Sequence, residues 1–198
     1  MLIDNRIVEN FLFYPANFWP HKNHICILLA MRILNIKYGI RYEAIFTGGD
    51  SGNFAYIRAK AKELGLESAV HFSGFVSTEI LCSLYKKAFA LVYPSFFGPN
   101  NLPPLEAMTL GCPVICSDAD GMKEQLGNSA IFFDPKREDE LAERIYQLYS
   151  NVQERTRLVE AGKKCALNWT QDDYLTSILA IVEEFEPYKR CWDLFSEK

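Results

Sequence analysis

The segment from Ala88 to Ser117 constrains the fold most, because it reads as two buried strands separated by a loop and a short helix. Ala88–Tyr93 is a short and almost wholly apolar run, which is typical of a strand buried on both faces of a parallel sheet. Pro94 cannot donate a ladder hydrogen bond, so the strand should end there. Pro103 and Pro104 favour the first turn of a helix. The segment therefore predicts one repeating unit of a parallel α/β sheet.

The predicted helix continues over Leu105–Leu110 and should end at Gly111, which can adopt the left-handed conformation of a C-terminal cap. Val114–Cys116 is then the next buried strand. A helix whose N-terminus lies at the carboxyl end of a parallel strand attracts anions through its free N–H groups and its dipole. We therefore expect the backbone N–H groups of Asn101 and Leu102 to hold a phosphate group.

The whole chain repeats this alternation of strand and helix, which predicts a parallel sheet between two helical layers. We expect one doubly wound, Rossmann-like α/β domain over residues 1–186, followed by a C-terminal tail over residues 187–198. The predicted strands are Phe11–Tyr14, Tyr42–Thr47, Ala69–Phe72, Ala88–Tyr93, Val114–Cys116 and Ala130–Phe133. The main predicted helices are Ile25–Tyr38, Asn53–Leu64, a helix capped by Ser77, Glu138–Ser150, Val152–Trp169 and Asp172–Phe185.

Composition excludes several classes of function. The net charge of −4 argues against a nucleic-acid partner, which would require a basic surface. No apolar run is long enough to span a bilayer, and the N-terminus lacks the pattern of a signal peptide. The six cysteines show no C-x-x-C spacing and form no zinc pattern with the three histidines. We therefore expect free thiols in a cytoplasmic protein and no bound metal.

The sequence PSFFGPNNLPPLEAMTLGCPVI, at residues 94–115, resembles the donor-site signature of family 4 of the GT-B glycosyltransferases, the group 1 glycosyltransferases. That signature contains one Glu, seven further residues and a second Glu. Glu106 matches the second Glu, whereas Gly98 stands in place of the first. The resemblance implies the C-terminal, donor-binding half of a GT-B fold. It also implies that the acceptor-binding half is a separate N-terminal partner.

The resemblance assigns further residues to the donor site. Lys22 matches the lysine that binds the donor diphosphate, and Asn17 stands where the family usually has a second cation, an arginine. Gly48 resembles the glycine that lets the donor approach the second strand. The turn at Phe75 and Val76 resembles the one that contacts the nucleobase. In addition, Glu106 would bind the ribose hydroxyls, and Asn100 or Asn101 would reach the hexose.

The implied activity is retaining, metal-independent transfer of a hexose from a nucleoside-diphosphate sugar to a glycan or a lipid-linked acceptor. It requires no cofactor, and Lys22 and Glu106 would be its central residues. The substitutions at Gly98 and Asn17 leave two interpretations open: a subgroup with a changed sugar contact, or a non-catalytic nucleotide-sugar-binding subunit. A flavodoxin-like or dehydrogenase-like domain is a third, although the G-x-G-x-x-G fingerprint is absent. The resemblance also leaves open peripheral association with the inner membrane face.

Overall fold

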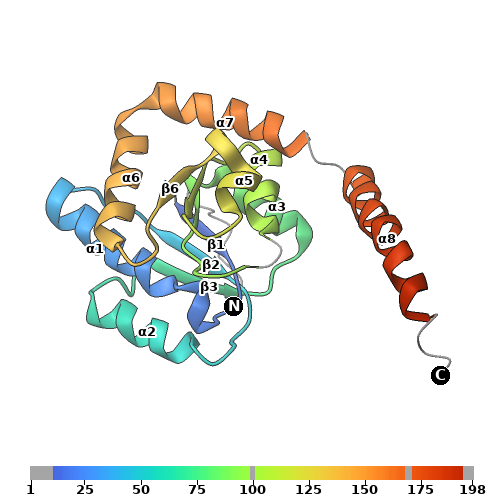
Figure 1. Ribbon diagram of the computed structural model, residues 1–198. Coiled ribbons are helices and arrows are strands. Elements are labelled where there is room, and N and C mark those ends of the chain that lie inside the picture. The colour runs from blue at the N-terminus through green and yellow to red at the C-terminus, as the bar shows by residue number, and fades with distance from the viewer. Residues whose placement is uncertain (1–10, 99–100, 168–170, 194–198) are drawn as a thin grey trace. The chain divides into compact units, whose positions relative to one another are not determined.

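A computed structural model describes residues 11–98, 101–167 and 171–193, and these contain a six-stranded parallel sheet (Figure 1). The strand order is β3-β2-β1-β4-β5-β6, so the predicted doubly wound α/β fold is confirmed. All six predicted strands are present, with ends that differ from the predictions by at most two residues. The strands are β1 (Leu12–Pro15), β2 (Ala44–Thr47), β3 (Val70–Gly74), β4 (Ala90–Tyr93), β5 (Val114–Ser117) and β6 (Ile131–Phe133).

The first strand, β1, lies at the centre of the sheet. Leu12 is paired with Ala44 of β2 on one side and with Ala90 of β4 on the other. The side chains of Phe11 through Tyr14 are fully buried, which explains why this stretch is apolar without alternation. The chain leaves β1 toward β2 and β3 and later returns to β4. The loops that follow β1 and β4 therefore separate, and a crevice forms at the carboxyl edge of the sheet.

The helices form layers on the two faces of the sheet (Figure 1). Tyr38 of α1 stacks on Tyr146 of α6 with ring centroids 4.0 Å apart. The α-helices up to residue 167 are α1 (His24–Tyr38), α2 (Phe54–Glu63), α3 (Thr78–Lys87), α4 (Leu102–Thr109), α5 (Met122–Leu126), α6 (Glu138–Ser150) and α7 (Val152–Leu167). The same residues also contain two 3-10 helices, η1 (Pro20–Lys22) and η2 (Gly127–Ser129). None of the described helices has the length and apolar character that crossing a membrane requires.

The predicted helix ends are present. The Ser77 hydroxyl accepts a hydrogen bond from the Ile80 N–H at 3.4 Å, which caps α3. Gly111 follows α4 with a φ of +76°, the left-handed conformation expected of a terminating glycine. Cys26, Cys82, Cys112, Cys116 and Cys165 are free thiols.

The chain divides into two compact units, residues 1–166 and residues 167–198. The second unit contains α8 (Gln171–Asp193), which continues beyond the predicted end at Phe185. Residues 187–193 are therefore helical where we predicted a tail, and residues 194–198 lie outside the described residues. The limit of the donor domain at residue 186 stays a prediction.

Asn23 joins three separate parts of the first unit. It lies between η1 and α1 with a φ of +56°, a left-handed conformation that asparagine tolerates better than most residues. Its buried side-chain amide donates to the carbonyl oxygens of Pro94 at 3.2 Å and Pro135 at 2.8 Å. The loop after β1 is thereby attached to the ends of β4 and β6.

Replacing Asn23 should separate the cost of the two hydrogen bonds from the cost of the backbone conformation. Asn23→Gly keeps the left-handed backbone and should lower the free energy of unfolding by about 1–3 kcal/mol, because one buried and one partly buried carbonyl lose their donor. Asn23→Ala should lose about 1 kcal/mol more, since alanine is strained at this φ. Urea unfolding measures both. A Gly variant as stable as the wild type would contradict the role of the side chain.

His24 is fully buried among the rings of Tyr14, Phe18 and Phe46, and it stacks on Phe18 with centroids 4.4 Å apart. Neither ring nitrogen makes a hydrogen bond of standard geometry within the described residues. Burial lowers the pKa of His24 to about 3, although the backbone of Ala16 offsets part of the effect. In the folded protein, the His24 imidazole therefore stays neutral at pH values at which it is protonated in the unfolded chain.

This depressed pKa predicts a pH dependence of stability. The contribution of His24 is complete above the unfolded pKa of about 6.5 and is lost as the pH falls toward 3. Between pH 7.5 and pH 5, that loss should be roughly 2 kcal/mol. His24→Phe, which keeps an aromatic ring, should remove this part of the pH dependence in urea unfolding curves. Equal pH dependence in the two proteins would show that His24 does not contribute it.

Candidate functional site

A pocket of about 300 Å³ lies at the carboxyl edge of the sheet, where the loops after β1 and β4 separate. Ligands of open α/β sheets bind in such a crevice. The lining residues come from the end of β1, from η1, from the end of β4 and from the start of α4. They are Pro15, Ala16, Lys22, Tyr93, Gly98, Asn101, Leu102 and Pro103. Four residues that the sequence assigned to the donor site thus line one pocket: Lys22, Gly98, Asn101 and Leu102.

Lys22 supplies the positive charge of this pocket. Its side chain is partly buried, and its Nζ donates to the Tyr93 hydroxyl at 3.5 Å and lies 5.6 Å from the centre of the Tyr93 ring. The Tyr14 hydroxyl donates to the Lys22 carbonyl at 2.9 Å and fixes the backbone. Burial lowers the pKa of Lys22, and no carboxylate of the described residues forms an ion pair with it. An unpaired, partly desolvated ammonium group favours an anionic ligand.

Asn17 and Gly48 lie on adjoining loops and outside the pocket lining. The Gly49 N–H donates to the Asn17 side-chain oxygen at 2.9 Å, so the amide nitrogen of Asn17 keeps its donors for another partner. A Cβ atom at Gly48 would lie 2.5 Å from the Ala16 carbonyl oxygen. The close approach at Gly48 is therefore to the backbone of the loop after β1, and its predicted contact with a donor stays a prediction.

Phe75 and Val76 follow β3 in a loop near Asn17. The Phe75 side chain is 81% exposed, and its ring lies against Gly49, where a Cβ atom would be 2.8 Å from it. Val76 is partly buried and packs against the core. An exposed aromatic ring at this edge offers a surface on which a planar group can stack. The predicted base contact at these two residues is untested.

The start of α4 offers few backbone donors, because Pro103 and Pro104 have no N–H group. Asn101 precedes the helix with a φ of +30°, and Leu102 is 55% exposed. The N–H groups of these two residues are therefore the donors that the first turn can direct at a ligand. Asn100, the other asparagine of the prediction, lies outside the described residues.

Glu106 is exposed one turn into α4 and is held by a residue that the sequence did not reveal. The Tyr85 hydroxyl donates to the Glu106 Oε2 at 2.8 Å. Tyr85 is buried on α3, and burial together with the adjacent carboxylate raises its pKa strongly, so the hydroxyl stays protonated. In the sequence, Tyr85 reads as part of the apolar face of its helix, because nothing local marks its hydroxyl as a donor. The contact fixes one carboxylate oxygen and leaves the other for a ligand.

Gly98 replaces an expected carboxylate, and the structure shows what occupies the space beside it. A Cβ atom at Gly98 would lie 2.5 Å from the Asn101 side-chain oxygen and 3.0 Å from the Tyr93 hydroxyl. The Tyr93 hydroxyl in turn donates to that Asn101 oxygen at 3.4 Å. A glutamate at position 98 would therefore have to displace Asn101.

The arrangement can bind an anion between one cation and a helix N-terminus, with a fixed carboxylate one turn away along α4. Among the described residues, no group of three His, Cys, Asp or Glu side chains lies close enough to hold a metal ion. The chemistry that these residues offer is electrostatic binding of a phosphate group and hydrogen bonding to hydroxyls.

Comparison with known proteins identifies a family and relatives of this chain. Residues 5–165 match the family described as "Glycosyl transferases group 1". The chain is 30% identical to O-antigen chain mannosyltransferase B of Escherichia coli over 139 residues, 70% of this chain and 36% of that protein. It is 32% identical to O-antigen chain mannosyltransferase RfbU of Salmonella typhimurium over 136 residues, 69% of this chain and 37% of the relative. The chain thus spans little more than a third of the length of these curated relatives.

Solved structures share the fold. The C-terminal domain of a group 1 glycosyltransferase (LpcC) from Francisella tularensis superposes with a TM-score of 0.70 at 21% identity, covering 81% of this chain and 85% of that domain. HepE from Anabaena, crystallised with UDP, superposes with a TM-score of 0.74 at 22% identity, covering 90% of this chain and 49% of HepE. The fold is thus that of a C-terminal GT-B domain. Since the family match extends over most of its length, the chain belongs to the group 1 glycosyltransferases.

Proposed function

We propose that this chain is the donor-binding domain of a retaining glycosyltransferase and that it holds a nucleoside-diphosphate sugar in the pocket between β1 and β4. The observation that carries the proposal is the partly buried ammonium group of Lys22, which has no carboxylate partner among the described residues and which shares a pocket with the start of α4. The diphosphate would lie between Lys22 and the N–H groups of Asn101 and Leu102. The free amide nitrogen of Asn17 would add a neutral donor.

Glycosyl transfer releases a nucleoside diphosphate, whose negative charge grows as the glycosidic bond breaks. Donors that are already fixed in position stabilise such charge without reorganisation, and losing one typically costs about 10²–10³ in rate. Lys22 is fixed in this way, because Tyr14 and Tyr93 hold its backbone and its side chain. The leaving group would therefore be stabilised by protein groups, and the reaction would need no metal ion.

The two carboxylate oxygens of Glu106 would have different tasks. Tyr85 occupies Oε2, so Oε1 would accept a hydrogen bond from a ribose hydroxyl. The exposed ring of Phe75 and the adjacent Val76 would contact the nucleobase. The donor would thus extend from the loop after β3, past α4, to Lys22. With Gly98 in place of a carboxylate, the Asn101 amide would contact the hexose.

The curated relatives named above are mannosyltransferases, so a nucleoside-diphosphate mannose is the first donor to test. The acceptor would be a glycan or a lipid-linked sugar. Because the chain spans little more than a third of these relatives, we propose that a separate N-terminal half supplies the acceptor site. The same observation supports the second candidate, a nucleotide-sugar-binding subunit that is inactive alone. Donor hydrolysis or transfer by the isolated chain would exclude that alternative.

Nucleoside diphosphates should stabilise the protein. At a ligand concentration 100 times Kd, the gain is about 2.7 kcal/mol, which corresponds to roughly 5–10 °C in Tm for a chain of this size. Lys22→Met should weaken binding about tenfold or more, because it removes a charge-assisted hydrogen bond. Thermal-shift titrations with the diphosphates UDP, GDP and ADP, and with the monophosphate CMP, measure the change in Tm.

The matched control for this test is Lys60→Met. Lys60 lies on α2, where its Nζ forms an ion pair with Glu63 at 2.7 Å, outside the pocket lining. This variant should bind the nucleotide as the wild type does. If none of the nucleotides shifts Tm, or if both lysine variants lose affinity equally, the pocket is not the diphosphate site.

The Tyr85–Glu106 contact predicts a selectivity for ribose. The wild type should bind a nucleoside diphosphate about tenfold more tightly than the 2′-deoxy analogue, and Glu106→Ala should abolish this ratio. Tyr85→Phe keeps the ring and its edge-to-face contact with Phe13, at 5.0 Å between centroids, but releases Oε2. The ratio should then fall to about threefold or less while affinity for the deoxy analogue is unchanged.

Calorimetric titration measures these affinity ratios. The matched control is Tyr149→Phe on α6, because Tyr149 is exposed, does not line the pocket and does not contact Glu106. If Tyr85 had only a structural role, Tyr85→Phe would lower the affinity for the nucleoside diphosphate and for its 2′-deoxy analogue by the same factor. An unchanged ratio in Tyr85→Phe would show that the hydroxyl does not position Glu106 for the ribose.

A further inference from the structure

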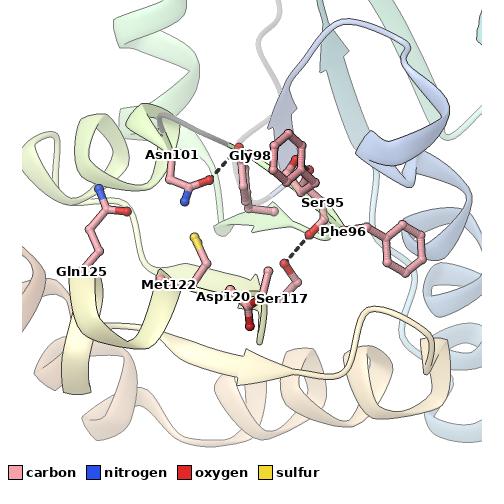
Figure 2. Close-up of a pocket in the computed structure, with 12 residues that line it drawn as sticks. Ser95, Phe96, Gly98, Asn101, Ser117, Asp120, Met122 and Gln125 are labelled. Atoms are coloured by element: carbon pink, nitrogen blue, oxygen red, sulfur yellow. Dashed lines mark hydrogen bonds between the residues drawn. The ribbon is translucent and has the colours of Figure 1, made fainter. Parts of the chain in front are cut away.

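A second pocket, of about 500 Å³, adjoins the first one, since the two have lining residues in common. Figure 2 shows this second pocket. One wall comes from the end of β4 and the loop after it. The opposite wall comes from the end of β5 and from α5, where Asp120, Met122 and Gln125 lie. Its volume is within the range of about 300–1,000 Å³ that is usual for small-molecule sites. The proposed diphosphate site does not use this space.

The two pockets share a wall. Tyr93, Gly98 and Asn101 line both of them. The wall is thin at Gly98, because this residue has no side chain and the Asn101 amide fills the adjacent space. A group bound in the second pocket would therefore lie next to the end of a diphosphate held by Lys22. In the proposed donor site, glycosyl transfer would take place here, since reacting atoms must approach to about 3–3.5 Å.

Two polar side chains opposite this wall, those of Asp120 and Gln125, have no partners in the described residues, whereas the Ser117 hydroxyl donates to the Ser95 carbonyl. The Asp120 carboxylate forms neither a hydrogen bond nor an ion pair there, whereas the nearby Asp118 is paired with Lys123 at 2.6 Å. The Gln125 side-chain amide likewise makes no hydrogen bond within the described chain, and Figure 2 shows it on the same side of the view as Asn101. The Asp120 carboxylate can accept hydrogen bonds from hydroxyl groups, and the side-chain amides of Gln125 and Asn101 can donate to them.

The remaining lining is uncharged and combines aromatic and apolar side chains with the hydroxyls of Tyr93, Ser95 and Ser117. Met122 is buried, and the Phe97 side chain is 65% exposed at the pocket. No lysine or arginine lines the pocket, so the carboxylate of Asp120 would repel a phosphate or another anion. A single carboxylate is also too few ligands for a metal ion. A neutral ring with apolar C–H faces and several hydroxyls fits this lining best, because it can contact the aromatic ring and satisfy the polar groups together.

We propose that this pocket is a sugar subsite in which Asp120 and Gln125 bind hydroxyl groups of a neutral pyranose. The inference rests on the proposed donor site, whose diphosphate end it adjoins. The pyranose is either the hexose of the donor or the terminal sugar of the acceptor, and both present the same chemistry. In either case, selectivity for the sugar lies in the loop after β5 and in α5, whereas affinity for the nucleotide lies in the loop after β1 and at the start of α4.

The test uses Asp120→Ala and Gln125→Ala, with Glu124→Ala as the control, since Glu124 is an exposed residue of α5 that does not line the pocket. Each protein is titrated with GDP, with GDP-mannose, and with methyl α-mannoside in the presence of GDP, by calorimetry and saturation-transfer NMR. All variants should bind GDP as the wild type does. Asp120→Ala should weaken one of the two sugar ligands about tenfold, and Gln125→Ala about threefold or more.

Weaker binding of GDP-mannose alone identifies the donor hexose as the occupant, and weaker binding of the glycoside alone identifies the acceptor sugar. The subsite is overturned if Asp120→Ala and Gln125→Ala bind both sugar ligands with wild-type affinity. It is also overturned if the wild type binds GDP-mannose no more tightly than GDP and does not bind the glycoside. Failure of the wild type to bind GDP and the other nucleoside diphosphates counts against the proposed function instead. In that case a glycoside signal that Asp120→Ala abolishes would still support the sugar pocket.

Discussion

The parallel pairing of β1 with both β2 and β4 is the constraint on which the rest of the structure depends. It places an apolar strand at the centre of the sheet and makes the chain leave it in one direction and return on its other side. The loops that follow β1 and β4 must then separate, because they belong to crossovers on opposite faces. Lys22 and the start of α4 stand on the two sides of that crevice. The position of the site thus follows from topology.

Inside the crevice, most polar groups are engaged by the protein itself, and the few that remain free define the chemistry. The oxygen of Asn17 accepts from Gly49, and one oxygen of Glu106 accepts from Tyr85. The amide of Asn23 is used for the carbonyls of Pro94 and Pro135. Among the described residues, the groups that remain for a ligand include the Lys22 ammonium group, the amide nitrogens of Asn17 and Asn101, one oxygen of Glu106 and the N–H groups of Asn101 and Leu102. Such fixed groups lose little entropy when they bind a ligand.

The departures of this chain from the usual family signature have local physical explanations. Gly98 and Asn101 are complementary, since the asparagine side chain fills the space into which a side chain at position 98 would project. The neutral Asn17 holds the loop after β2 in place through a hydrogen bond that the five-donor guanidinium of an arginine cannot accept. Both substitutions therefore form part of consistent local packing. They leave Lys22 as the cation of the pocket.

The sequence by itself determined the six strands, their alternation with helices, the start of α3 and the end of α4, because these depend on local patterns of apolar, capping, proline and glycine residues. It indicated the family through the resemblance of residues 94–115 to a known signature. It also marked Lys22 and Glu106 through a motif. The contacts of Tyr85, Asn17 and Asn23 were decided only by the tertiary structure, as was the second pocket with Asp120 and Gln125. Those side chains belong to elements far apart along the chain, and their neighbours are set by how the strands pair and the loops pack. No local pattern records that geometry.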